Sequence, residues 1–329
     1  MEHLESCPHC GGAWGRTVVS GGRDLLLGIG PGSYDLRECA ACGLVTVDPR
    51  PEAERVHDLY SGGAYYPTGG SGWRAPVGFL AGPAAWLRKS ARTIATLPYR
   101  VRFGAPTTAF PPSGQGRLFE IGFGGGEYLV QMRSLGWEVH GCELDARKVS
   151  HARSELWLEN VHHGRCEDLR YPPGHFDAIV MWHVLEHVHD PRALLARVFQ
   201  MLKPGGRLAL STPNANCAEA RLLGRWWIGY EIPRHLTLFN VETLRKLLND
   251  CGFEIGRVRP SLWAASLPDS ISLLVSDLTG CSIWGTRLHR MLYYGLFPLS
   301  VLWCVAGNWA VVEVAASKAV EPAAGRTRA

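Results

Sequence analysis

A glycine-rich turn between an apolar segment and a helical pattern carries the strongest chemical signal in the sequence. Residues 118–127 read LFEIGFGGGE, so Gly122, Gly124 and Gly126 follow an apolar run. Small glycines let the backbone approach a ligand closely, and in parallel sheets ligands bind beyond the carboxyl ends of the strands. Glu120 adds an acid beside the turn, which disfavours a pyrophosphate. The turn therefore suits a ligand with positive groups, such as an amino acid or a sulfonium.

A second acid follows this turn at the spacing expected of a ribose ligand. Glu143 ends the next apolar segment and lies 21 residues after Gly122. In nucleotide-binding folds an acid roughly 20 residues after the first glycine accepts hydrogen bonds from the ribose hydroxyls. We therefore expect Glu143 to bind a ribose. A dinucleotide fingerprint needs glycine where this chain has Glu127, so an NAD-dependent oxidoreductase is the weaker alternative.

Two C-x-x-C-G pairs lie near the start of the chain. They contain Cys7 and Cys10, then Cys39 and Cys42. Four thiolates complete a closed tetrahedral zinc shell, and the glycine after each pair permits a turn with positive φ around the sulfur atoms. We expect a structural zinc site, with a redox pair or spare thiols as alternatives. Nucleic-acid binding is disfavoured because this segment lacks a basic cluster.

Strand and helix signals alternate from residue 117 onward. We expect strands at 117–121, 137–142, 176–181, 207–212, 253–259 and 309–317. We expect helices at 126–136, 145–158, 190–202 and 240–250, the third with Asp190 as its N-cap and Pro191 as its first residue. This alternation indicates βαβ units, and hence an α/β fold with a parallel sheet covered by helices on both faces.

Composition limits the class of protein. Of 329 residues 46% are apolar and 19% charged, and the net charge is +4. These values exclude a disordered, collagen-like or coiled-coil chain and argue against a dedicated nucleic-acid binder.

We expect four regions along the chain. They are a small N-terminal zinc ribbon at 1–48, a linker with a helical segment at 49–116, a main domain at 117–320 and a flexible tail at 321–329. Within the second region, linkers at 61–72 and 104–116 surround a basic helix at 78–103 that Pro83 and Pro98 are expected to bound.

Residues 117–214 resemble class I S-adenosylmethionine-dependent methyltransferases, particularly the ubiquinone-biosynthesis-like small-molecule group. The matching pieces occur in order as FEIGFGGGEYL, HGCELD, GRCEDLRYPPGHFDAIVMWHVLEHVHDP and LKPGGRLALSTPN. The resemblance implies a Rossmann-like seven-stranded methyltransferase sheet with its last strand antiparallel. It implies S-adenosylmethionine as cofactor, with Glu120 and the glycines around the methionine part and Glu143 on the ribose. It also implies that Cys166 and Glu167 contact the adenine and that Trp182 lines the methyl-transfer site.

Two histidines are candidate catalytic residues. A sulfonium methyl is already activated, so positioning supplies much of the rate and a base adds roughly 10²–10⁴-fold. His183 follows the fourth expected strand and would face the methyl. His235 follows Arg234 in a P-R-H-L segment common in this group, and either would hold or deprotonate the acceptor. A capping role under the following helix is the alternative for Arg234 and His235, and Glu186 is expected to be mainly structural.

We therefore predict a cytoplasmic methyltransferase with a structural zinc ion. Its acceptor would be a small molecule methylated on oxygen or carbon, such as a sugar, a glycan precursor, a quinone-like ring or a secondary metabolite. No nucleic-acid partner is expected, and the N-terminus lacks the features of a signal peptide. The non-enzyme alternative is a zinc-ribbon binding module on a non-catalytic methyltransferase fold.

An apolar insertion at 261–306 is the least explained region. Within and beyond it, residues 291–312 contain no charge over 22 positions, which is long enough for a membrane span, although Gly307 and Asn308 divide the stretch. Arg287 and Arg290 at one edge would suit anionic lipid. We expect peripheral membrane contact, a buried or substrate-lining segment, or a homodimer interface.

Overall fold

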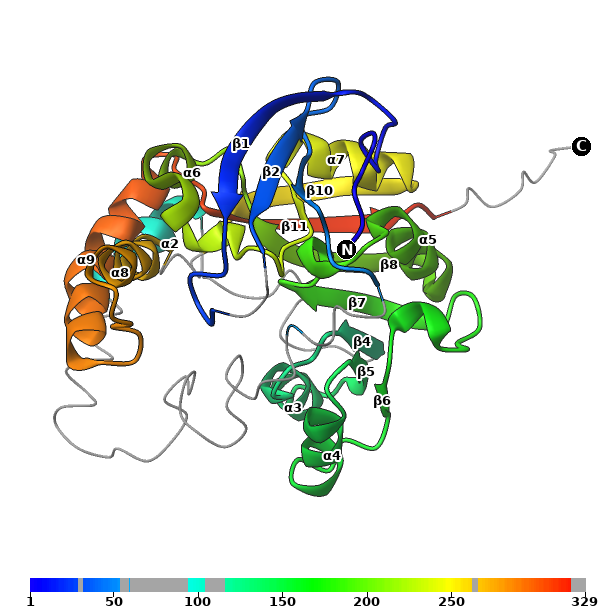
Figure 1. Ribbon diagram of the computed structural model, residues 1–329. Helices are drawn as coiled ribbons and strands as arrows, with labels where there is room; N and C mark the ends of the chain where they lie inside the picture. Colours follow the sequence, from blue (N-terminus) through cyan, green and yellow to red (C-terminus); the bar gives the residue numbers. More distant parts are fainter. Residues whose placement is uncertain (29–31, 54–58, 60–93, 104–115, 262–265, 321–329) are drawn as a thin grey trace, which may run out of the picture. The chain divides into compact units, whose positions relative to one another are not determined.

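The computed structural model describes residues 1–28, 32–53, 59, 94–103, 116–261 and 266–320 of the chain (Figure 1). These residues belong to two compact units. The first combines Met1–Thr107, Pro213–Asn240 and Pro260–Val312, and the second combines Thr108–Thr212, Val241–Arg259 and Glu313–Ala329. The glycine turn therefore belongs to the second unit, and the paired cysteines belong to the first.

A seven-stranded sheet underlies the second unit, in the order β10-β11-β8-β7-β4-β5-β6. Its strands are β4 Arg117–Ile121, β5 Glu138–Glu143, β6 Val161–His163, β7 Phe176–Trp182, β8 Leu202–Pro213, β10 Phe253–Pro260 and β11 Val311–Lys318. Five neighbouring strands of this sheet pair in parallel, in the order β8-β7-β4-β5-β6. The predicted α/β fold with a seven-stranded sheet is confirmed.

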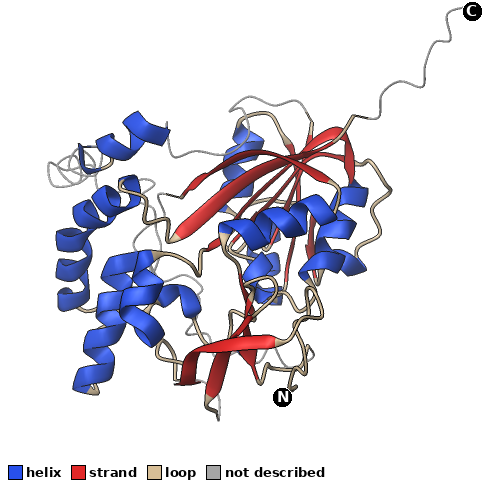
Figure 2. Cartoon of the chain, turned by 90° about the horizontal axis from the view of Figure 1, so that it is seen from above, coloured by secondary structure: helices blue, strands red, loops and turns tan. Residues whose placement is uncertain are grey.

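Helices flank this sheet, as Figure 2 shows in blue beside the red strands. They are α3 Glu127–Ser134, α4 Ala146–Ser154, α5 Pro191–Met201 and α7 Val241–Asp250. The predicted start of α5 is confirmed, because Asp190 Oδ1 accepts a hydrogen bond from Ala193 N at 2.9 Å and Pro191 is the first helical residue. The predicted start of β8 at 207 is wrong, because the strand begins at Leu202. Its pairing with β7 shifts register between the first residues and Arg207.

A four-stranded antiparallel sheet, in the order β1-β2-β3-β9, carries the paired cysteines in the first unit. Its strands are β1 Trp14–Gly22, β2 Tyr34–Cys39, β3 Val45–Asp48 and β9 Thr237–Leu238. The last strand comes from a segment far along the chain. Its core includes Tyr34, Leu36, Val45, Val47, Trp227, Leu236 and Leu238. The N-terminal strands therefore share one sheet and one core with residues around 237.

The helices of the first unit are α2 Leu97–Phe103, α6 Ala218–Leu223, α8 Ser266–Thr279 and α9 Arg287–Val305. The apolar insertion thus contains α8 and α9, and Tyr99 of α2 packs with Phe297 and Val301 of α9. Pro98 lies at the start of α2 and does not end a helix there. Proline is tolerated in a first helical turn, and Pro98 is the second residue of α2. In the part of the chain described, no helix is both long and apolar enough to cross a membrane.

Several predicted features fall outside the described residues. They are the linker at 61–72, residues 78–93 of the predicted basic helix, which include Pro83, residues 104–115 of the second linker and the tail at 321–329.

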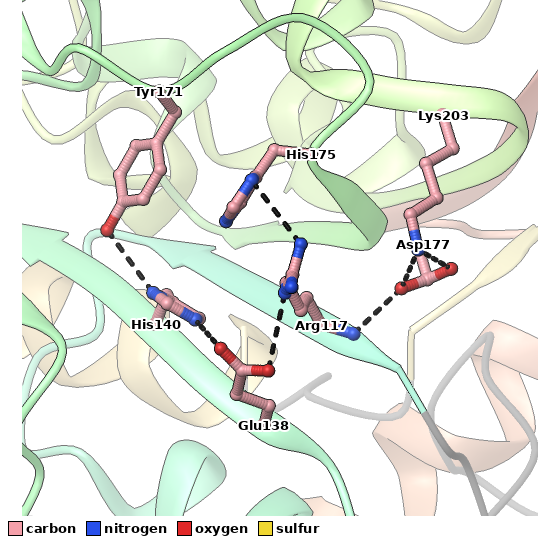
Figure 3. A network of polar contacts seen from close by, with 7 residues as sticks. All are labelled: Arg117, Glu138, His140, Tyr171, His175, Asp177 and Lys203. Atoms are coloured by element: carbon pink, nitrogen blue, oxygen red, sulfur yellow. Dashed lines mark hydrogen bonds and ion pairs between the residues drawn. The ribbon is translucent and has the colours of Figure 1, made fainter.

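A network of polar side chains occupies the amino ends of three central strands (Figure 3). Arg117 begins β4 and Glu138 begins β5, and Arg117 Nε lies 3.3 Å from Glu138 Oε2. Asp177 in β7 accepts hydrogen bonds from Arg117 N at 2.8 Å and from Lys203 Nζ at 2.7 Å. Glu138 Oε1 lies 2.9 Å from His140 Nε2. Because the glycine turn follows the opposite end of β4, we assign this network a structural role.

Two histidines beside this network have lowered pKa values. His162 Nε2 lies 2.8 Å from the Tyr171 hydroxyl. Burial, and then the charge of Arg153, lowers the pKa of His162 below its usual 6.5. Burial and the charge of Arg117 likewise lower the pKa of His175. The unfolded chain therefore binds protons at these sites more readily than the folded chain does.

We predict that the free energy of unfolding decreases as the pH falls below 6.5, where the unfolded imidazoles gain protons first. A His162→Gln variant keeps a hydrogen-bonding side chain beside Tyr171 and should lose less stability between pH 6.5 and about 5. Denaturant unfolding at several pH values measures this slope. His151→Gln, on the exposed side of α4, is the control. Equal slopes for wild type and His162→Gln would contradict the assignment.

Candidate functional site

The turn between β4 and α3 has a left-handed backbone at three glycines. Gly122, Gly124 and Gly126 have φ values of 67°, 55° and 83°. A Cβ would lie 2.7 Å from a Val184 methyl at Gly122 and 2.9 Å from a Leu156 methyl at Gly126, so a side chain would clash there. At Gly124 a Cβ would meet no atom of the described residues within 4 Å. The space above Gly124 is thus open to a ligand.

The Glu143 carboxylate ties this turn to the end of β5. Its Oε2 accepts a hydrogen bond from Gly124 N at 2.9 Å. Its Oε1 accepts from Leu144 N at 2.8 Å and from Asp145 N at 3.1 Å. A carboxylate has about four lone-pair sites, so Glu143 can also accept hydrogen bonds from ligand hydroxyls. Its position suits the predicted ribose contact.

Glu120, near the end of β4, is a buried acid. Its residue is 3% exposed, and its Oε2 has no hydrogen-bond partner among the residues described. Burial, and then the charges of Glu127 and Glu143, raises the pKa of Glu120 well above its usual range. A cationic group would offset this concentration of negative charge. The site therefore fits a ligand that carries an ammonium or a sulfonium.

Tyr128 and Trp182 add two unsatisfied polar atoms near Glu120. Their ring centroids are 5.7 Å apart. Tyr128 Oη and Trp182 Nε1 are buried and lack hydrogen-bond partners within the described chain. Burial and the charge of Glu120 raise the pKa of Tyr128. Three such atoms together are unusual in a native interior and point to a polar ligand. Trp182 is one of the residues predicted from the sequence to line this site. Tyr128 was not predicted, because no sequence motif singles it out.

The two predicted adenine contacts lie in the short 3₁₀ turn η2, Cys166–Asp168. The Cys166 side chain belongs to the core, since its residue is 2% exposed and its Sγ lies 3.9 Å from Met201 Sδ. A ligand contact from Cys166 would therefore come from its backbone. Glu167 is exposed.

His183 directly follows β7 in a strained backbone conformation, with φ of 54°. Its Nδ1 lies 3.0 Å from Oε1 of Glu186, a fully buried carboxylate. An ionised carboxylate only accepts hydrogen bonds, so beside an ionised Glu186 the proton of a neutral His183 ring would lie on Nδ1 and Nε2 would be left as an acceptor. Glu186, expected to be mainly structural, also orients His183.

Arg234 and His235 lie in the first unit. Arg234 is fully buried, with Asp24 at 2.6 and 2.9 Å and Glu231 at 2.8 Å from its guanidinium. This pairing favours the structural alternative for Arg234, and the partner Asp24 is 210 positions away, beyond any local pattern. His235 is 4% exposed, and its Nδ1 donates to Gly229 O at 2.8 Å. Its Nε2 lies 3.5 Å from Glu231 Oε2.

The four paired cysteines converge in the first unit. Their Sγ atoms all lie within 4.8 Å of one another. The Cys7–Cys42 and Cys10–Cys39 sulfur distances are 3.7 and 3.5 Å. Thiolates around a tetrahedral zinc ion are about 3.8 Å apart when each Zn–S distance is about 2.3 Å. The four sulfur atoms therefore fit such an ion.

The backbone around these sulfur atoms has the predicted form. Gly11 and Gly43 have φ values of 70° and 71°. Their N–H groups donate to Cys7 O and Cys39 O, each at 2.9 Å. Burial would raise the pKa of Cys39, but neighbouring backbone N–H groups and the Cys10 thiol lower it to about 7.

A family model for the methyltransferase domain matches residues 90–258, just over half of the chain, and the chain belongs to this family. A ubiquinone biosynthesis O-methyltransferase of Xanthomonas campestris is 34% identical over 144 residues, which cover 42% of this chain and 59% of that protein. A probable S-adenosylmethionine-dependent methyltransferase of Mycolicibacterium smegmatis is 28% identical over 141 residues, covering 42% of this chain and 52% of that protein. The chain thus spans about half the length of the curated relatives it matches. A solved S-adenosylmethionine-dependent methyltransferase from Mesorhizobium loti aligns with 69% of this chain at a TM-score of 0.44 and 20% identity, over its whole length.

We predict that Cys39→Ser reduces bound zinc from about one ion per chain to near zero and lowers the melting temperature, because a three-thiolate shell binds the metal less tightly. Metal analysis by mass spectrometry and thermal unfolding measure both effects. Cys281→Ser, at an exposed cysteine outside the cluster, is the matched control and should change neither. Full zinc content in Cys39→Ser would contradict the metal assignment.

Proposed function

We propose that this protein transfers a methyl group from S-adenosylmethionine to an oxygen or carbon atom of a small-molecule acceptor. The observation that carries the proposal is the buried, unsatisfied acid Glu120 beside a glycine turn that Glu143 holds open. The buried acid would be stabilised by a positively charged group, and the Glu143 carboxylate can accept hydrogen bonds from hydroxyl groups. S-adenosylmethionine carries positively charged groups and ribose hydroxyls. Membership of the methyltransferase-domain family supports the same activity.

Each cofactor contact is proposed from the chemistry of the residue. Glu143 would accept hydrogen bonds from the ribose hydroxyls, and Glu120 would face the ammonium group. The three glycines, Gly122, Gly124 and Gly126, would let the backbone approach the ligand. The backbone of Cys166 and the side chain of Glu167 would contact the adenine. Trp182 would close the site beside the methionine part.

We propose that His183 is the base that takes up the proton lost by the methyl-accepting molecule. When bound, S-adenosylmethionine supplies a methyl group that is already activated by the sulfonium. The chain must then orient the acceptor, exclude water and take up a proton. The contact of His183 Nδ1 with Glu186 orients the ring, and Nε2 would take up the proton if Nδ1 donates to that carboxylate. His235 has a comparable arrangement, with Nδ1 bound to Gly229 O, and is the second candidate.

Zinc is proposed as a structural ion held by Cys7, Cys10, Cys39 and Cys42. Four thiolates would leave no open coordination position, so the ion would not take part in the chemistry. Its role would be to hold the turn between β2 and β3. That turn leads directly into β3, the strand that pairs with β9.

Helix α9 supports a peripheral membrane contact as a finer part of the proposal. Leu288, Met291 and Leu302 are 46%, 71% and 54% exposed. With Leu299 they recur at helical spacing along one side of the helix, whose first turn has Arg287 and Arg290. An exposed apolar side next to basic residues suits an anionic lipid surface.

We predict that wild-type protein floats with anionic vesicles at low salt and that Met291→Glu abolishes this binding, because it places a charge on the apolar side. Leu244→Val in the buried core of α7 is a control for general loss of stability. A Met291-dependent dimer in size-exclusion chromatography, without vesicle binding, would instead assign the surface to self-association.

Calorimetric titration with S-adenosylhomocysteine tests the proposed function. Wild type should bind saturably, and Glu120→Gln should weaken binding at least tenfold, because the ammonium loses a charged partner. The same variant should melt at a higher temperature. The raised pKa of Glu120 means that its ionised form costs folding free energy as the pH rises above 4.5.

Exposed Glu159→Gln is the control and should leave both binding and melting unchanged. Absence of saturable binding to wild type would overturn the proposed function. A lower melting temperature in Glu120→Gln would contradict the account of Glu120.

A further inference from the structure

The register of the central strands places Glu120 and Trp182 on one face of the sheet in the second unit. Glu120 in β4 lies opposite Val180 in β7, and Trp182 follows Val180 by two residues. Since alternate residues of a strand point to the same face, the two side chains are diagonal neighbours at the carboxyl ends of these strands. Val180 and Leu129 of α3 belong to one apolar core, against which Tyr128 and Trp182 also pack. Glu120, Tyr128 and Trp182 therefore form one cluster beside the first turn of α3.

The polar atoms of this cluster need partners of different kinds. Glu120 Oε2, Tyr128 Oη and Trp182 Nε1 are buried and have no hydrogen-bond partner among the described residues. An indole N–H only donates hydrogen bonds, and a tyrosine hydroxyl can donate one. Tyr128 and Trp182 are only partly buried as residues, so a ligand can reach their side chains. The cluster thus offers one acid and two uncharged donors to a ligand.

The charges around the cluster narrow the chemistry of that ligand. Burial is the first cause that raises the pKa values of Glu120 and Tyr128, and the further causes are charges of acids, Glu127 and Glu143 for the first and Glu120 for the second. A simple anion would be repelled by these carboxylates. A simple amine would suit Glu120 but leave both donors unpaired, because an ammonium accepts no hydrogen bond. The α-amino acid end of a ligand meets both needs, since it carries an ammonium next to a carboxylate.

We infer that Tyr128 and Trp182 bind the carboxylate of the methionine part of S-adenosylmethionine while Glu120 faces its ammonium. This inference rests on the proposed function and adds two specificity-determining residues to it. Tyr128 Oη and Trp182 Nε1 would each donate a hydrogen bond to a carboxylate oxygen. Their rings meet edge to face at 73°, with centroids 5.7 Å apart, which fixes each ring against the other. The site would thus select against adenosine thioethers that lack the amino acid carboxylate.

Two ligands that differ only in this carboxylate test the inference. They are S-adenosylhomocysteine and its decarboxylated form, S-adenosyl-3-thiopropylamine, which keeps the adenine, the ribose, the thioether and the ammonium. Each is titrated by calorimetry into the full chain. We expect wild type to bind the decarboxylated compound at least tenfold more weakly, because both donors then lack their charged acceptor.

The variants assign this discrimination to the two donors. Tyr128→Phe and Trp182→Phe each remove one donor and keep an aromatic ring. Each should weaken binding of S-adenosylhomocysteine about tenfold and change binding of the decarboxylated compound less than about twofold. Retained binding of the decarboxylated compound also shows that each variant is folded. Tyr294→Phe, at an exposed tyrosine of α9, is the matched control and should change neither affinity.

Three results would overturn the inference and leave the proposed function standing. They are equal affinity of wild type for the two ligands, unchanged affinity of both phenylalanine variants for S-adenosylhomocysteine, and equal weakening of both ligands in these variants. The last result would mean that the two side chains only maintain the shape of the site. Absence of saturable binding of S-adenosylhomocysteine to wild type would overturn the proposed function and this inference together.

Discussion

The carboxylate of Glu143 is the interaction on which the proposed cofactor site depends. It accepts hydrogen bonds from Gly124 in the glycine turn and from Leu144 and Asp145 after β5. One side chain thus fixes the loops after two adjacent strands with respect to each other. The positive φ values of the turn then leave open space above Gly124. Without this carboxylate, the backbone that must approach a ligand would lose its anchor.

Charge at this site opposes stability, which is typical of a binding site. Glu120 is buried beside Glu127 and Glu143, and its pKa is raised by burial and by those charges. Burying a hydrophobic side chain there would cost less free energy than burying a carboxyl group. The buried acid is therefore best understood as a partner for a cationic ligand.

Local patterns predict much of the fold and the backbone form of the glycine and cysteine turns. Asp190 and Pro191 mark the start of α5, and the glycine after each cysteine pair adopts the expected positive φ. Long-range contacts are not predictable in this way. The pairing of β3 with β9 joins residues nearly two hundred positions apart, and the Asp24–Arg234 ion pair spans 210. Neither leaves a periodic or motif signal, so the environment of Arg234 and His235 emerges only from the structure.

The central claim is that Glu143 and Glu120 hold the ribose and the ammonium of one ligand. A crystal structure of the protein with S-adenosylhomocysteine tests it most directly. The account predicts both ribose hydroxyls within about 3 Å of the Glu143 carboxylate and the ammonium beside Glu120. Ligand bound elsewhere, or bound with its ribose away from Glu143, would contradict it.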